Sequence, residues 1–178
     1  MVPFGERTLP ALLVRRAALG ERAFIRSGSH SVTYAEAPRI AARCAGALAA
    51  AGVHPGDRVA AFCTNRIELL HLWLGTAWLG AVLVPINTAF RGDQLRHLLR
   101  LASPVALLGE SALLPALRDV VDALAPVHSV WACDLAPQAM PGTLGRCPVQ
   151  PWTGEGAPVA AHPVTPGDPV AVLYTSGT

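Results

Sequence analysis

The end of the chain carries the residue types best suited to holding a phosphate group. An apolar run over residues 169–174 leads directly into Thr175, Ser176, Gly177 and Thr178. Glycine lets a backbone approach an anion closely, successive N–H groups can point at its oxygens, and hydroxyls donate further hydrogen bonds. We therefore predict a strand followed by a phosphate-binding loop. Because an ordinary turn after a strand has the same composition, these residues alone are a weak signal.

The chain contains no lysine, since all fourteen of its basic residues are arginine. Any mechanism that needs an ammonium group to hold a phosphate or form a Schiff base has no candidate among these residues. No Walker A pattern is present, and no G-x-G-x-x-G follows a predicted strand. Nucleotide-binding proteins of the P-loop and Rossmann types are therefore disfavoured.

Short apolar runs alternate with helical patterns along most of the chain, which favours β-α-β units. We expect an α/β fold: a largely parallel sheet flanked by helices, preceded by a β-hairpin, with a Pro- and Gly-rich surface excursion over residues 134–168. The expected helices cover residues 8–20, 33–52, 65–79, 93–101 and 111–124, the hairpin strands 23–26 and 31–34, and the sheet strands 59–63, 81–86, 105–108, 129–133 and 169–174.

Two helix starts carry specific signals. Thr8 has the residue type of an N-cap and is followed by an early proline. Thr33 and Glu36 have the spacing of a capping box, in which hydroxyl and carboxylate satisfy the first amides of a helix. Pro38 would then lie just past the first turn, and we expect a local kink there.

Composition bounds the class of protein. With 52% apolar and 15% charged residues, 178 residues are enough for one domain with a substantial core. The arginines are scattered rather than clustered, so nucleic acid is a poor candidate partner. Cys44, Cys63, Cys133 and Cys147 lack the spacing of a zinc site or disulfide framework, which favours reduced structural thiols. No secretory signal is recognisable, and we expect a cytoplasmic protein.

The stretch from Leu69 to Ala89 is long and apolar enough to raise the alternative of a membrane span. Gly75, Gly80 and Pro85 divide it, so we interpret it as a buried helix followed by a buried strand. No integral membrane association is expected.

Several other side chains invite a functional interpretation but have simpler ones. Glu68 is expected to complement a helix dipole, and His71 to be a satisfied core histidine. Trp73 and Trp78 are expected to be core residues of one buried helix. Arg91, after the strand at 81–86, is expected either to contact a ligand or to be solvated.

Four blocks in order resemble the adenylate-forming superfamily of acyl-CoA synthetases, firefly luciferases and peptide-synthetase adenylation domains. Residues 32–36 resemble its T-Y-x-E-L start, although Ala37 replaces the leucine, and residues 52–60 resemble G-V-x-x-G-D-R-V-A. Asn65 to Glu68 followed by residues 79–87 resemble N-x-x-E and G-A-x-x-V-P-x-N. Residues 173–178 match the first half of the signature loop Y-T-S-G-T-T-G-x-P-K-G.

The resemblance implies an enzyme that uses ATP and Mg²⁺ to convert a carboxylic acid to an acyl-adenylate and then transfers the acyl group to coenzyme A. It implies that Thr175, Ser176, Gly177 and Thr178 contact the β- and γ-phosphates of ATP. The loop lysine, the adenine-binding segment, the metal-binding block and the C-terminal domain of the family would lie beyond residue 178. Residues 1–178 are then the N-terminal portion of the large domain, truncated inside its phosphate loop and inactive alone.

Two alternatives remain. The chain could be the N-terminal part of a peptide-synthetase adenylation domain, although V-P-I-N rather than V-P-I-D favours a CoA ligase. It could also be a non-catalytic remnant that keeps the fold and acts as an interaction module. The identity of the acid and the oligomeric state are not readable from these residues.

Overall fold

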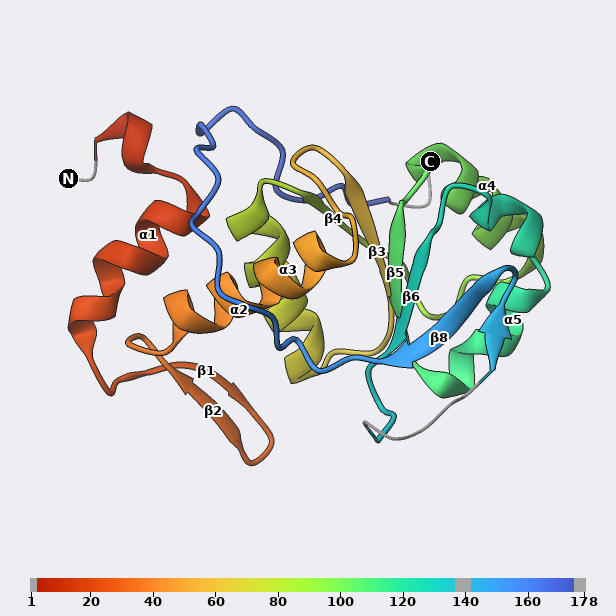
Figure 1. Ribbon diagram of the computed structural model, residues 1–178, viewed down its shortest axis with the longest axis horizontal. Coiled ribbons are helices and arrows are strands. Elements are labelled where there is room, and N and C mark those ends of the chain that lie inside the picture. The colour runs from red at the N-terminus through yellow and green to blue at the C-terminus, as the bar shows by residue number, and fades with distance from the viewer. Residues whose placement is uncertain (1–2, 137–141, 175–178) are drawn as a thin grey trace. The chain divides into compact units, whose positions relative to one another are not determined.

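The computed structural model describes residues 3–136 and 142–174, which form two compact units (Figure 1). The first, here the helical unit, is built from the chain up to residue 56, residues 66–81 and residues 154–170. The second, the sheet unit, is built from residues 57–65, residues 82–153 and the chain from residue 171. Each unit therefore combines segments that are distant in sequence.

The helical unit begins with a capped helix and a hairpin. Its elements up to the hairpin are η1 (Phe4–Glu6), α1 (Leu9–Arg16), η2 (Ala17–Leu19), β1 (Ala23–Ser27) and β2 (His30–Thr33). The Thr8 hydroxyl accepts a hydrogen bond from the Ala11 amide at 3.4 Å, as its N-cap prediction requires. Gly20 follows at φ 61°, a conformation that glycine adopts without strain. β1 and β2 pair antiparallel, so the predicted hairpin is confirmed.

The second helix of this unit, α2 (Ala37–Ala50), starts later than expected. The capping-box bonds do form: the Thr33 amide donates to the Glu36 carboxylate at 2.9 Å, and the Glu36 amide donates to the Thr33 hydroxyl at 3.3 Å. They close a turn over residues 34–36, however, and Pro38 lies in the first turn of α2. A proline there loses no helical hydrogen bond, so the stated reason for a kink is absent and that prediction was wrong.

α2 packs against α3 (Ile67–Leu79), and a segment we call the strap, residues 154–162, crosses both helices. The Gly156 and Val159 amides donate to carbonyls of α2, and the Trp78 indole of α3 donates to the Val159 carbonyl at 2.9 Å. The strap passes so close to α2 that a Cβ added at Gly46 would lie 1.9 Å from the Ala157 oxygen. Only glycine, which has no Cβ, fits there without a shift of the strap.

Within residues 57–65, 82–136, 142–153 and 171–174, the sheet unit contains six strands in the order β4-β3-β5-β6-β8-β7. They are β3 (Arg58–Phe62), β4 (Val82–Pro85), β5 (Ala106–Gly109), β6 (Ser129–Ala132), β7 (Thr143–Leu144) and β8 (Cys147–Pro151). All neighbouring pairs are parallel except β7 with β8. The expected α/β class, with a largely parallel sheet flanked by helices, is confirmed (Figure 1).

One face of this sheet carries the core of the unit. Side chains of β3, β4, β5, β6 and β8 pack with α4 (Gly92–Ala102), α5 (Leu114–Arg118) and η4 (Val121–Leu124). Phe62, Leu99, Leu107 and Leu117 are fully buried in this cluster. Burying side chains of this size typically stabilises a fold by about 1.5–3 kcal/mol each, before the opposing conformational entropy is counted.

Two parts of the sheet unit differ from expectation. The single helix predicted over residues 111–124 is three pieces, η3 (Ser111–Leu113), α5 and η4, because Pro115 can be accommodated only in a first turn and Val120 has a non-helical conformation. The prediction of a surface excursion over residues 134–168 was wrong where β7 and β8 form. In β8, Cys147 and Val149 are buried while Pro148 and Gln150 are exposed, a two-residue period that the prolines obscured.

The predicted strand at residues 169–174 is not formed as a full strand. Residues 169–174 make a single parallel bridge, between Ala171 and Leu83 of β4, with the Val172 amide donating to the Leu83 carbonyl at 2.9 Å. Among the described residues, none of the helices is long and apolar enough to cross a membrane.

Candidate functional site

The carboxyl ends of the parallel strands are the first place to look for a binding site in the sheet unit. Ligands of open α/β sheets bind beyond these ends, at the point where the strand order reverses. The chain places β4 on one side of β3 and then crosses to place β5 on the other side. The order therefore reverses between β3 and β5.

A hydrogen-bonded pair spans this point. The Thr64 hydroxyl, two residues after β3, donates to the Glu110 carboxylate at 2.5 Å, and the Thr64 amide donates to the same oxygen at 3.2 Å. Glu110 follows β5 directly, and its amide donates to the Phe62 carbonyl at 3.2 Å. These bonds tie the loop after β3 to the loop after β5.

Neighbouring strand ends are held by similar local bonds. After β6, the Asp134 carboxylate accepts from both the amide and the hydroxyl of Ser111 at 2.9 Å. After β4, the Asn87 side chain accepts from the Ala89 amide at 2.9 Å. Glu110 and Asp134 thus serve as loop clamps, and Asn87 closes its own turn.

Arg91, which directly precedes α4, brings a positive charge to this edge. One terminal nitrogen, Nη1, donates to the carbonyls of Thr88 and Phe90 at 2.5 and 2.7 Å. The guanidinium carbon lies 5.9 Å from the centre of the Phe62 ring, within the range of a cation–π contact. The side chain is exposed but oriented.

The phosphate-binding residues predicted from the sequence, Thr175, Ser176, Gly177 and Thr178, lie outside the described residues. The chain that leads to them is described as far as Tyr174. Tyr174 packs against the same apolar cluster that contains Ile86, the residue following β4. Because Ala171 pairs with Leu83 in parallel, the described chain up to Tyr174 runs in the direction of the carboxyl end of β4.

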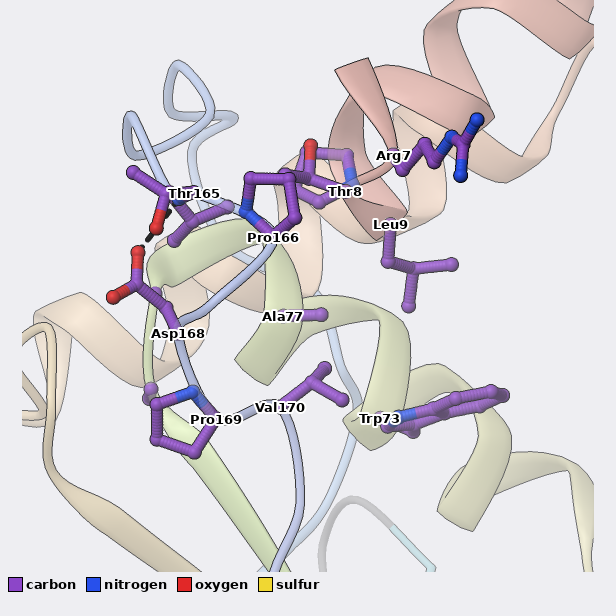
Figure 2. Close-up of a pocket in the computed structure, with 14 residues that line it drawn as sticks. Arg7, Thr8, Leu9, Trp73, Ala77, Thr165, Pro166, Asp168, Pro169 and Val170 are labelled. Atoms are coloured by element: carbon purple, nitrogen blue, oxygen red, sulfur yellow. Dashed lines mark hydrogen bonds between the residues drawn. The ribbon is translucent and has the colours of Figure 1, made fainter. Parts of the chain in front are cut away.

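The helical unit has a pocket of its own, of about 170 Å³ (Figure 2). It is lined by residues 7–10 at the start of α1, by Trp73, Ala77, Gly80 and Ala81, and by residues 164–166 and 168–170. The Asp168 carboxylate accepts from the Thr165 amide at 2.6 Å, and the Arg7 side chain extends away from that pair. The pocket therefore has no convergent set of charged groups.

The two tryptophans of α3 differ. Trp78 is buried, as predicted, and its indole nitrogen is satisfied by the strap. Trp73 is only half-buried and lines the pocket, so its assignment to the core was incomplete.

Glu68 and His71 lie one turn apart on α3. Glu68 is in the first turn, as expected, and accepts from Arg66 Nε at 2.8 Å. Burial opposes its ionisation, but the Arg66 hydrogen bond and charge outweigh this effect and lower the pKa of the carboxyl. His71 differs from expectation: its Nε2 is buried and has no hydrogen-bond partner among the described residues. Burial lowers the pKa of His71, although Glu68 and Glu155 act in the opposite direction.

The four thiols are buried, as structural cysteines should be. Cys44 donates to the Gly154 carbonyl, and burial raises the pKa of its thiol to about 12. Within residues 3–136 and 142–174, no three His, Cys, Asp or Glu side chains are grouped so as to hold a metal ion. The Mg²⁺ implied by the resemblance does not require a cluster of that kind, because proteins usually bind this ion through one or two carboxylates together with substrate phosphates.

Sequence reasoning did not identify Thr64, Glu110, Ser111 or Asp134. Their signal was available: each is a polar residue just after an apolar run predicted to be a strand, and parallel strands bring such positions to one edge. Which of them hydrogen-bond to one another depends on strand order, which periodicity does not give.

Comparison with known proteins adds the family. The model of the family described as AMP-binding enzyme matches residues 14–178. The long-chain-fatty-acid–CoA ligase FadD13 of Mycobacterium tuberculosis is 31% identical over 150 residues, covering 83% of this chain and 27% of that protein. The feruloyl-CoA synthase of an Amycolatopsis species is 34% identical over 166 residues, covering 93% and 30%. The chain thus spans less than a third of either relative.

Solved structures agree on the fold. The anthranilate CoA ligase AuaEII, crystallised with anthranoyl-AMP, superposes with a TM-score of 0.80 over 99% of this chain and 33% of that one, at 19% identity. At that identity the likeness concerns the fold alone. Because the family model covers nearly all of the sequence, the chain belongs to the family of AMP-binding enzymes, as its sequence blocks indicated.

Proposed function

We propose that this chain is the N-terminal portion of an ATP-dependent acyl-CoA synthetase. Its full reaction would join a carboxylic acid and ATP into an acyl-adenylate with release of pyrophosphate, and then transfer the acyl group to coenzyme A. The family match over residues 14–178 carries the proposal. The relatives named above and a similar medium/long-chain-fatty-acid–CoA ligase, FadD6, are CoA ligases of fatty acids and of ferulate, which supports the CoA step.

Within this proposal, residues 1–178 form part of the large domain, and Thr175, Ser176, Gly177 and Thr178 begin the loop that holds the β- and γ-phosphates. Donors at this position would stabilise the negative charge on departing pyrophosphate. When bound, Mg²⁺ would neutralise part of the same charge. The enzyme would work in the cytoplasm.

The chain alone is proposed to be inactive. Catalysis of adenylation needs a cation at the phosphates, a nucleotide pocket and an acid pocket, and the family resemblance assigns most of these groups to segments after residue 178. The lack of any lysine fits this division.

The test is acid-dependent exchange between ATP and labelled pyrophosphate, run on two proteins: the 178-residue chain, and the product of its gene read through and beyond codon 178. The acids are medium- and long-chain fatty acids and hydroxycinnamic acids. We expect exchange, and a CoA thioester, only with the longer product. Exchange by the 178-residue chain would refute its inactivity, and a longer product silent with every acid would refute the ligase assignment.

The same experiment separates the alternatives. A peptide-synthetase adenylation domain would show exchange with an amino acid but form no CoA thioester. A reading frame that stops after codon 178 would favour the interaction module, and co-purification of a separately encoded partner would then become the informative measurement.

A further inference from the structure

We propose that Arg91 is a phosphate-binding residue of this chain, which holds one phosphate group through its Nε and Nη2 donors. The nature of the phosphate compound rests on the proposed function. The role of Arg91 itself rests on the geometry of the sheet unit.

Two carbonyl groups orient the guanidinium of Arg91. Nη1 carries two protons, and two carbonyl groups, those of Thr88 and Phe90, accept from it. Nε and Nη2 lie on the other side of the group, where their N–H bonds are parallel and form the fork that binds two oxygens of one anion. In residues 3–136 and 142–174, no hydrogen bond or ion pair occupies that fork.

The Arg91 side chain is held in place before a ligand binds. A flexible arginine gives up side-chain entropy when it binds an anion, which reduces the net gain. Here the two carbonyl contacts, together with the Phe62 ring whose centre lies 5.9 Å from the guanidinium carbon, hold the side chain in one place before any ligand arrives. Phe62 is fully buried, so the surface beneath the cation is itself fixed.

Arg91 lies where a ligand of this kind of sheet is expected. Arg91 follows β4 by six residues and lies at the carboxyl edge of the parallel sheet, where open α/β folds bind ligands. The segment leading to the predicted phosphate loop pairs with β4 at Leu83, and its Tyr174 packs on the cluster that Phe90 also contacts. Arg91 thus holds an oriented cation at the edge toward which that described segment runs.

The acidic side chains near Arg91 already have other partners. The acidic residue nearest in sequence, Asp93, is paired with Arg96 at 2.5 Å, and Glu110 is bonded to Thr64. Since the chain has no lysine, a side chain that carries a permanent positive charge toward a phosphate must be an arginine. Arg91 brings such a charge to this edge.

The test measures binding of inorganic pyrophosphate to the 178-residue chain by titration calorimetry. The variants are Arg91→Gln, which removes the charge, Arg91→Lys, which keeps the charge but loses the fork, and Arg118→Gln as control. Arg118 is an exposed arginine at the end of α5 in the same unit, so its loss changes net charge equally. We expect Arg91→Gln to weaken binding about tenfold or more, Arg91→Lys to weaken it less, and Arg118→Gln to leave it unchanged.

A second measurement does not depend on the variants folding. In the wild-type chain, the Arg91 side-chain Nε–H signal in a ¹⁵N NMR spectrum should move on addition of pyrophosphate. If that signal stays in place, if the wild-type chain binds no pyrophosphate, or if Arg91→Gln binds as tightly as Arg118→Gln, the inference is wrong.

The source of the phosphate group is resolved by pairs of related ligands. A dependence on Arg91 for ATP but not for AMP assigns the terminal phosphates of the nucleotide, and a dependence for CoA but not for 3′-dephospho-CoA assigns the ribose phosphate of CoA. Failures stay distinguishable: exchange by the longer product without Arg91-dependent binding sinks only this inference, and Arg91-dependent binding without exchange sinks only the ligase proposal.

Discussion

Replacing Gly46 by alanine would test how tightly the strap is held against α2. In an isolated helix this change would be favourable by about 1 kcal/mol, because glycine is the poorer helix former. In this protein the new Cβ would lie 1.9 Å from the Ala157 oxygen and 2.9 Å from its carbonyl carbon, both backbone atoms of the strap. The strap would have to move away.

Moving the strap breaks bonds that can be named. The Gly156 amide donates to the Arg43 carbonyl and the Val159 amide to the Ala42 carbonyl, each at 3.2 Å. At about 1 kcal/mol for each bond, and about 1–3 kcal/mol for overpacking a filled site, the loss exceeds the gain in helix propensity. We expect Gly46→Ala to lower the free energy of unfolding by about 2–4 kcal/mol, which corresponds to a fall in Tm of about 2–4 °C for each kcal/mol at this chain length.

The assay is urea denaturation combined with hydrogen exchange at the Gly156 and Val159 amides. Exchange at these amides should accelerate in Gly46→Ala by more than the global loss of stability explains. The control is Ala49→Gly, at an exposed position of the same helix, which should cost about 0.5–1 kcal/mol through propensity and leave strap exchange unchanged. A Gly46→Ala protein about 1 kcal/mol more stable than wild type, with an unchanged strap, would refute the reasoning.

Three further outcomes are expected. Leu99→Ala should lower the free energy of unfolding by about 2–5 kcal/mol in urea, because Leu99 is fully buried in the sheet-unit core, whereas exposed Leu101→Ala should cost about 0.5 kcal/mol or less; equal losses would contradict the described core. Because burial lowers the pKa of His71, the unfolded chain binds its proton more readily, so stability should decline as pH falls below about 6.5, the ordinary value for histidine. His71→Leu should flatten that decline in a series of thermal melts between pH 7.5 and 5, and an unchanged slope would show that His71 is not desolvated. Finally, the four buried thiols should resist Ellman's reagent at pH 8 until the protein is unfolded, and rapid labelling of Cys44, whose pKa burial raises to about 12, would place it at the surface instead.

The parts of the fold that sequence reasoning anticipated were those in which one local pattern decides the outcome. The strands at 59–63, 81–86, 105–108 and 129–133 are continuous apolar runs bounded by turn residues, and the structure places each within one or two residues of its expected limits. A parallel strand that is buried on both faces is encoded by such a continuous apolar run. The same holds for the N-cap at Thr8 and the hairpin.

The misses arose where tertiary contacts override local composition. Prolines at 148 and 151 argued against a strand, yet β8 forms because β6 offers it an edge and buries Cys147 and Val149. The strap has no hydrophobic periodicity, because its hydrogen bonds go to α2 and α3. Its own residues therefore do not predict these bonds. The edge contacts of Thr64 and Arg91 depend on strand order, which no single segment determines.

The division of each unit into distant segments has a consequence for synthesis on the ribosome. α2 and α3 are complete by residue 79, but the strap that covers them is made only after about a further 75 residues. At a translation rate of about 5–20 residues per second, the strap is synthesised several seconds after the two helices. During that interval the strap does not yet cover the surface around Gly46 and Trp78, so we expect chaperones that recognise exposed apolar helices to bind the nascent chain there.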